Sequence, residues 1–297
     1  MDRPRALRMR ASEVALASAL ALSATLHADE GSTPLAPVVV SATRAPADPF
    51  EVPAAVDAVD AESDDTAQSG LAPSLRGVPG VLARTRQNFA QDEQISIRGF
   101  GSRATFGVRG VRLYVDGIPA TMPDGQGQTS AFPLASAERV EVLRGPFSAL
   151  YGNASGGVVQ LFTEDGAGPT RWRAALDAGE NATWRDQVAV LGGDDRFDYH
   201  LDLARFASDT DRQHAHAERR QFNAKFNLGL ADGQRLSLVA NALDLPEAED
   251  PLGLTPAQFR QDPRQAAAAV GFEPSTSTTH DSTTIPVQVL RQRSRCG

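Results

Sequence analysis

The sequence has a single cysteine, a single lysine and no long apolar run, and each shortage excludes a class of structure. Cys296 alone among 297 residues excludes an internal disulfide and any paired-cysteine metal or redox site. Lys225 is the only lysine, and the net charge of −8 without a basic cluster on a periodic segment excludes nucleic acid as the expected partner. After the N-terminus, no stretch approaches the roughly 18 apolar residues of a membrane-spanning helix.

The N-terminus has the order of a secretory signal peptide. Four arginines between residues 3 and 10 precede an apolar run from Val14 to Leu26, and the small residue Ala28 follows at a plausible cleavage point. A buried amphipathic helix is the alternative, but the run is apolar all round. Residues 1–28 are therefore predicted to be a signal peptide, which places the mature chain in the periplasm, outside the cell or in an outer-membrane β-barrel.

Residues 29–52 are predicted to be an extended leader, because prolines recur among small residues. One β-favouring string interrupts it, formed by Val38, Val39, Val40, Ser41, Ala42 and Thr43. A β-branched segment between prolines can add as a strand to an exposed sheet edge of another protein. The alternative is an ordinary first strand of the domain that follows.

Residues 53–168 are predicted to form a compact α+β domain. A helix is expected from a cap at Asp65 to about Arg76, where Gly77 ends it. Short β-favouring runs separated by glycine-rich loops follow at 81–85, 94–98, 111–115, 140–143 and 157–162, with one-turn helices expected at 135–138 and 146–150.

Residues 169–270 show the period of two that is typical of β-strands. Apolar and polar residues alternate most clearly at 197–203, 222–230 and 236–242, and less cleanly at 172–179 and 184–191. Short turns between these runs predict antiparallel hairpins, four to five strands in all before Pro246. A soluble sandwich and a transmembrane barrel share this alternation, so the pattern leaves both open.

Four motifs in the α+β region carry a family resemblance. They are Ser96–Gly101 (SIRGFG), Val111–Pro119 (VRLYVDGIP), Glu138–Pro146 (ERVEVLRGP) and Leu150–Val158 (LYGNASGGV). In this order they resemble the plug domain of TonB-dependent outer-membrane receptors. The resemblance implies an α+β plug, a small mixed sheet with short helices, followed by the first antiparallel strands of a transmembrane β-barrel, which in that family has about 22 strands.

The resemblance also implies roles for particular residues. Val38 to Thr43 correspond to the TonB box, the segment that pairs with the periplasmic protein TonB. Apical plug loops would place ligand-binding residues at Arg103, Phe106, Asp124, Gln126 and Gln128. Arg98 and Arg144 would lock the plug by pairing with glutamates of the barrel wall.

The expected function is that of a TonB-dependent outer-membrane receptor, which takes up a scarce metal chelate of the siderophore type, or a cofactor, with energy supplied through TonB. The segment from Arg112 to Gln128 further resembles siderophore receptors and a subgroup linked to pyrroloquinoline quinone. The expected partners are TonB, outer-membrane lipid and the ligand, and no resident cofactor is expected. A secreted, soluble β-rich binding protein is the alternative.

Enzymatic and metal-site alternatives find no support in the sequence. His200, His214 and His216 could share a strand face, but the last two lie in a charged stretch that is typical of a solvated hairpin loop. The acidic pairs Asp92-Glu93 and Glu164-Asp165 lack the apolar pocket that a catalytic carboxyl requires. No nucleophile elbow, phosphate-binding loop or zinc-protease helix is present, so no catalytic residue is expected.

The C-terminal 271–297 segment breaks the pattern. Residues 273–284 are rich in Ser and Thr without alternation, and 288–297 become basic. The 127 residues after Thr170 are too few for about 22 strands of roughly 10 residues. The expectation is therefore an aberrant or disordered tail on a truncated, transport-incompetent receptor.

Overall fold

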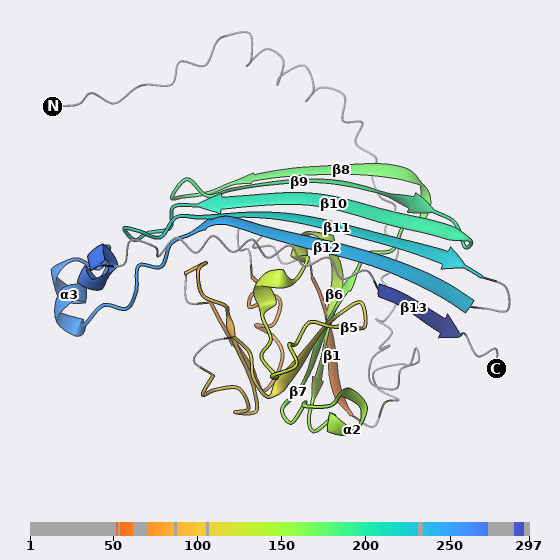
Figure 1. Cartoon of the computed structure of the whole chain (residues 1–297), viewed down its shortest axis with the longest axis horizontal. Helices are drawn as coiled ribbons and strands as arrows, with labels where there is room; N and C mark the ends of the chain where they lie inside the picture. Colours follow the sequence, from red (N-terminus) through yellow and green to blue (C-terminus); the bar gives the residue numbers. More distant parts are fainter. Residues whose placement is uncertain are drawn as a thin grey trace, which may run out of the picture. The chain divides into compact units, whose positions relative to one another are not determined.

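The computed structural model describes residues 52, 54–61, 70–85, 88–104, 107–230, 234–272 and 288–293, with side chains described as far as Val270 except that of Ser148. The predicted signal peptide, the Val38–Thr43 string and Phe106 lie outside these ranges. The described residues form a plug domain and a six-stranded sheet of long strands (Figure 1). Among them, no helix combines the length and the apolar character needed to cross a membrane.

The plug contains a five-stranded mixed sheet in the order β1-β6-β7-β4-β5. Its strands are β1 (Ala55–Asp60), β4 (Val111–Val115), β5 (Ile118–Pro119), β6 (Ala137–Arg144) and β7 (Gly157–Thr163). β4 and β7 are parallel, whereas the other pairs are antiparallel. A separate hairpin joins β2 (Val81–Arg84) to β3 (Gln94–Ile97). The mixed sheet confirms the predicted α+β plug, and β2, β3, β4, β6 and β7 confirm the predicted runs. β1 and β5 were not predicted.

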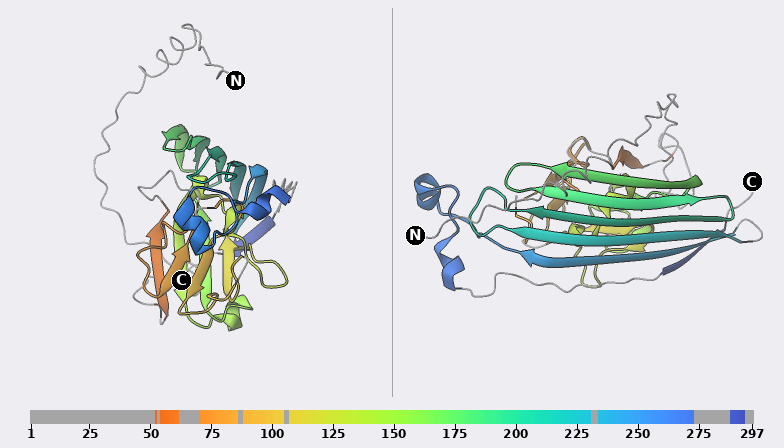
Figure 2. Two further views of the ribbon diagram at one scale, coloured as in Figure 1. Left: turned by 90° about the vertical axis from the view of Figure 1, so that its left-hand side faces the viewer. Right: turned by 90° about the horizontal axis from the view of Figure 1, so that it is seen from above.

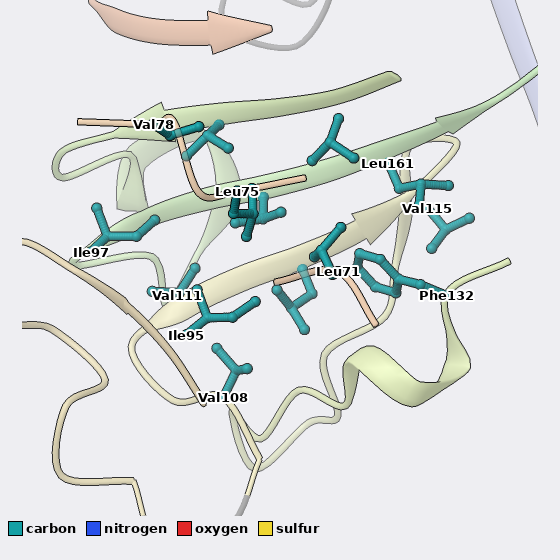
Figure 3. Packing of buried hydrophobic residues seen from close by; sticks show 14 residues of the cluster. Leu71, Leu75, Val78, Ile95, Ile97, Val108, Val111, Val115, Phe132 and Leu161 are labelled. Atoms are coloured by element: carbon teal, nitrogen blue, oxygen red, sulfur yellow. The ribbon is translucent and has the colours of Figure 1, made fainter. Parts of the chain in front are cut away.

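The plug core lies where the sheet meets the turns that precede β2. Leu71, Leu75, Ile95, Ile97 and Phe132 are fully buried in one apolar cluster, and Figure 3 shows these side chains converging from separate elements. Because burial of each large apolar side chain contributes about 1.5–3 kcal/mol, this cluster is the main stabilising feature of the plug.

The helix expected to run as far as Arg76 is wrong over its described part. Residues 71–80 form successive turns in which the N–H of Leu75 donates to the carbonyl of Ala72 and that of Arg76 to Pro73. Pro73 has no N–H and disfavours helical geometry at the residue before it. The short helices in the rest of the plug are η2 (Thr129–Ala131), η3 (Leu134–Ser136) and α2 (Ser148–Tyr151). The last two lie close to the predicted positions, whereas η2 was not predicted.

The second sheet is antiparallel, in the order β13-β12-β11-β10-β9-β8. Its long strands lie side by side in Figure 2: β8 (Gly168–Ala178), β9 (Trp184–Gly193), β10 (Phe197–Ser208), β11 (Ala217–Gly229) and β12 (Gln234–Ala248). After β12 come α3 (Pro256–Gln261) and η5 (Ala268–Phe272). The edge strand β13 (Gln288–Arg293) pairs with β12. The expectation of an aberrant or disordered tail over residues 271–297 stays a prediction.

This six-stranded sheet is hereafter called the wall. Its inward face is polar and its outward face is apolar, which is the reverse of a sheet in a soluble sandwich. On β10 and β11 the polar residues Asp198, His200, Asp202, Asn223 and Lys225 are buried against the plug. The apolar residues between them face outward, and the exposed ones are Trp172, Leu176, Val188, Phe197, Leu203, Leu228 and Leu238. A polar inner face and an apolar outer face are the arrangement of a strand wall in lipid.

Candidate ligand cavity and plug–wall interface

A cavity of about 900 Å³ lies between plug loops and one end of the wall. The plug contributes residues from 70–93 together with Thr129 and Ser130. The wall contributes the neighbouring ends of β10, β11 and β12, and Asp250 to Gly253 extend the lining beyond β12. The volume is that of a site for a drug-sized or somewhat larger ligand.

The plug loop 88–91 is fixed against the wall at this cavity. The ring of Phe89 packs edge-on against Phe206 of β10, with centroids 4.9 Å apart. Asp250 accepts hydrogen bonds from the side-chain amides of Asn88, at 2.7 Å, and Gln91, at 2.6 Å. One aromatic pair and one carboxylate thus hold the plug loop to the wall.

Two adjacent carboxyl groups of the plug lie beneath this loop. Glu93 is buried, and its carboxylate accepts the N–H groups of Leu71 and Ala72 at 2.8 and 3.0 Å. Burial raises the pKa of both Asp92 and Glu93, although hydrogen bonds and the charge of Arg219 partly oppose the rise. Glu93 thereby supplies a buried acceptor for two backbone groups that the turns of 71–80 leave unpaired.

The predicted ligand-binding residues lie elsewhere. Asp124 and Gln126 come together around Arg109, whose guanidinium is 3.5 Å from the Asp124 carboxylate and donates to Gln126 at 2.9 Å. Arg103 and Gln128 are exposed. None of these four predicted residues lines the cavity, so their role in binding stays a prediction.

The predicted locking residues contact other parts of the plug. Arg144 forms an ion pair with Asp57 of β1 at 2.6 Å and donates to the carbonyl of Pro79 at 2.9 Å. Arg98 is exposed and has a positive φ of 49°. Within the part of the chain that the structure describes, neither arginine forms a hydrogen bond or ion pair with the wall, and the pairing with barrel glutamates stays a prediction.

A cluster of ion pairs, hereafter the plug–wall lock, joins the plug to the wall. Its carboxylates lie on the plug side and the cation lies on the wall, which is the reverse of the predicted arrangement. Lys225 of β11 lies 3.1 Å from Asp116 and 2.7 Å from Asp165, and it donates to the carbonyl of Thr163 at 2.9 Å. Asp116 in turn accepts the N–H and hydroxyl of Thr163 at 3.0 and 2.7 Å. Burial alone raises the pKa of Asp165, but Lys225 and Arg235 lower it overall. The only lysine of the chain therefore holds the β7–β8 connection to the wall.

Backbone carbonyls of residues 130–135 form a second set of plug–wall contacts. Arg219 donates to the carbonyls of Ser130 and Phe132, and Gln187 and Asn241 donate to those of Ala135 and Ala131. The two short helices η2 and η3 leave these carbonyls without helical partners. Sequence reasoning missed this set, because amide side chains on strands give no signal of a partner in another domain.

The histidines do not assemble a metal site. His200 is buried, with Nδ1 3.0 Å from the carbonyl of Glu164. His214 pairs with Glu249 at 3.1 Å, and His216 with Asp209 at 2.7 Å, in the hairpin loop where they were predicted. Among the described residues, no group of three or more metal-ligating side chains has the geometry to hold an ion.

The plug is thus fastened to a wall that is polar inside and apolar outside, and comparison with known proteins shows what this part of the chain is similar to. Residues 48–158 match the family described as TonB-dependent Receptor Plug Domain. A hemin receptor from Yersinia enterocolitica is 32% identical over 208 residues, covering 66% of this chain and 28% of the relative. The ferrienterobactin receptor of Escherichia coli (strain K12) is 37% identical over 123 residues, 36% of this chain and 15% of the relative.

The solved structures show the same fold. The pyoverdine outer membrane receptor FpvA from Pseudomonas aeruginosa PAO1, bound to pyoverdine, aligns with a TM-score of 0.59 at 20% identity, covering 70% of this chain and 30% of that chain. The chain thus spans less than a third of the length of these three relatives, all named as receptors rather than enzymes. Residues 48–158 therefore carry the plug domain of TonB-dependent receptors.

Proposed function

We propose that this chain acts in an outer-membrane receptor that binds a metal chelate from outside the cell and admits it past the plug with energy from TonB. The reversed faces of the wall support this function best, because a polar face against the plug and an apolar face toward the surroundings suit a strand wall in lipid. A secreted soluble protein would expose the same apolar residues to water at a cost in solubility.

The ligand class follows from the relatives and the cavity together. The relatives are named for hemin, ferrienterobactin and pyoverdine. A cavity of about 900 Å³ with an aromatic ring, Phe89, in its lining suits a chelate of comparable size. We infer that the cavity, rather than the Arg109–Asp124–Gln126 cluster, supplies the main binding contacts on this side of the site.

Two variants separate the cavity from the predicted loop site. Phe89→Ala removes a ring that lines the cavity, whereas Gln126→Ala removes a side chain outside it. Titration of the purified protein with hemin, ferric enterobactin and ferric pyoverdine is expected to show saturable binding of at least one chelate, weakened by Phe89→Ala and unchanged by Gln126→Ala. Loss of binding with Gln126→Ala alone would favour the predicted loops, and no saturable binding would contradict the receptor function.

Coupling to TonB is proposed through Val38 to Thr43, which lie outside the described residues. β-Branched residues between prolines suit strand addition, and proline at position 39 would remove a backbone donor from such a ladder. Val39→Pro is therefore expected to reduce site-specific cross-linking to TonB while chelate binding is retained. Unchanged cross-linking by this variant would count against the assignment.

A further inference from the structure

A loop beside the cavity is held together by hydrogen bonds from a single arginine. Residues 250–267, hereafter the cavity loop, follow β12 and include α3. Arg212, from the β10–β11 connection, donates through Nη1 to the carbonyl of Leu252 at 2.7 Å and through Nη2 to that of Pro251 at 3.1 Å. The same guanidinium donates to the carbonyl of Gln265 through Nη2 at 2.9 Å and Nε at 3.3 Å. One planar group thus bonds carbonyls near both ends of the loop.

Other hydrogen bonds close the same loop. The N–H of Ala267 donates to the carbonyl of Pro251 at 3.0 Å, and the N–H of Gln213 donates to that of Arg264 at 2.8 Å. Within the loop, Thr255 and Gln258 form a capping box at the start of α3. A loop whose ends are bonded together and whose interior has its own capped helix needs no ligand to become ordered.

The cavity loop is also tied to the cavity and the plug. Its first residues, Asp250 to Gly253, line the cavity, and Asp250 is the acceptor for Asn88 and Gln91 of the plug. The N–H of Leu252 donates to the same Asp250 carboxylate at 2.9 Å. The position of the loop relative to the plug therefore depends on the segment that Arg212 holds.

We propose that Arg212 is a positioning residue that holds the cavity loop as a preformed wall of the ligand cavity, and not as a lid that folds over bound ligand. This inference rests on the proposed receptor function. The planar guanidinium can satisfy carbonyls that diverge around it, whereas a lysine ammonium at the same place is a point charge on a flexible stem. A preformed wall also lowers the ordering cost that ligand binding would otherwise carry.

Hydrogen exchange of the purified protein tests the proposal without requiring a ligand. In the wild type, the amides of Leu252, Gln258 and Ala267 are expected to be protected before any ligand is added, and addition of hemin is expected to leave their exchange rates unchanged. Arg212→Gln and Arg212→Lys are both expected to raise these rates at least about tenfold, because several charge-assisted bonds are lost. The amide of Thr163, which bonds Asp116, should keep its wild-type rate.

The matched control is Arg220→Gln. Arg220 lies on β11 and pairs with Glu218 and Asp244 at an exposed position, so this variant removes an arginine without touching the cavity loop. Loop amides that exchange freely in the wild type and become protected only with hemin would overturn the proposal in favour of a lid. Full protection in Arg212→Lys would overturn the role of the guanidinium. Failure of every chelate to bind would instead contradict the receptor function, since the exchange comparison without ligand stands apart from it.

Discussion

Replacing Lys225 with methionine removes from the plug–wall lock the cation that pairs with Asp116, while keeping the apolar part of the side chain. The Asp116 carboxylate, whose side chain is 5% exposed, then has no cation but keeps its two hydrogen bonds from Thr163. Asp165 is 45% exposed and keeps Arg235 at 3.1 Å, so the loss falls mainly on Asp116.

The expected loss in the free energy of unfolding is about 3 kcal/mol. Breaking a buried ion pair by removing one partner costs about 3–5 kcal/mol, because the remaining charge stays buried. The two retained hydrogen bonds at Asp116 place the value at the lower end. The double variant Lys225→Met/Asp116→Asn removes both charges, and asparagine tolerates the positive φ of 49° at this position. It is expected to recover to within about 1 kcal/mol of the wild type.

A double-mutant cycle, measured by urea titration of the purified protein in detergent, checks both numbers. Arg220→Gln on the same strand is the control, because its side chain is 54% exposed and surface pairs contribute less than about 1 kcal/mol. A Lys225→Met variant within about 1 kcal/mol of the wild type, or an Asp116→Asn change that fails to compensate for it, would contradict a stabilising ion pair between Lys225 and Asp116.

Three further changes test the plug and the outer face of the wall. Burial raises the pKa of Asp92 above its ordinary 3.8. The protonated carboxyl of Asp92 therefore contributes to stability below pH 3.8, and this contribution is lost as the pH rises through the raised pKa. Asp92→Asn should flatten the dependence of Tm on pH, and an unchanged slope would contradict this. Gly157 has a φ of 147°, and an added Cβ would lie 2.2 Å from the carbonyl oxygen of Leu143. Gly157→Ala should therefore lower the free energy of unfolding by at least about 2 kcal/mol. Gly77→Ala is the neutral control, because no atom lies within 4 Å of its added Cβ, and equal Tm values for the two variants would contradict the expected clash. Leu203 on the outer face is 59% exposed, so Leu203→Arg should cost about 2–4 kcal/mol in a lipid-facing wall and reduce the membrane-bound fraction, whereas a soluble protein would tolerate it.

The local features of the chain were predictable because their signals are local. Glycine and proline mark the ends of the short plug strands, and the alternation of residues 197–242 gave long antiparallel strands. Where local signals conflict, the prediction failed. The cap at Asp65 favoured a helix to Arg76, but Pro73 breaks it and Glu93, distant in sequence, binds the freed N–H groups.

What only the tertiary structure decided is which face of each strand meets which neighbour. A period of two is the same for a soluble sandwich and a wall in lipid, so the sequence could not state that the polar residues face the plug. Arg144 was expected from its motif to pair with the wall, and only the fold shows that Asp57 of β1 lies beside it. Lys225 was recognisable from the sequence only as a lone lysine. Its partner Asp116 lies 109 positions away, and an ion pair between two domains depends on how they pack, which no short segment of sequence encodes.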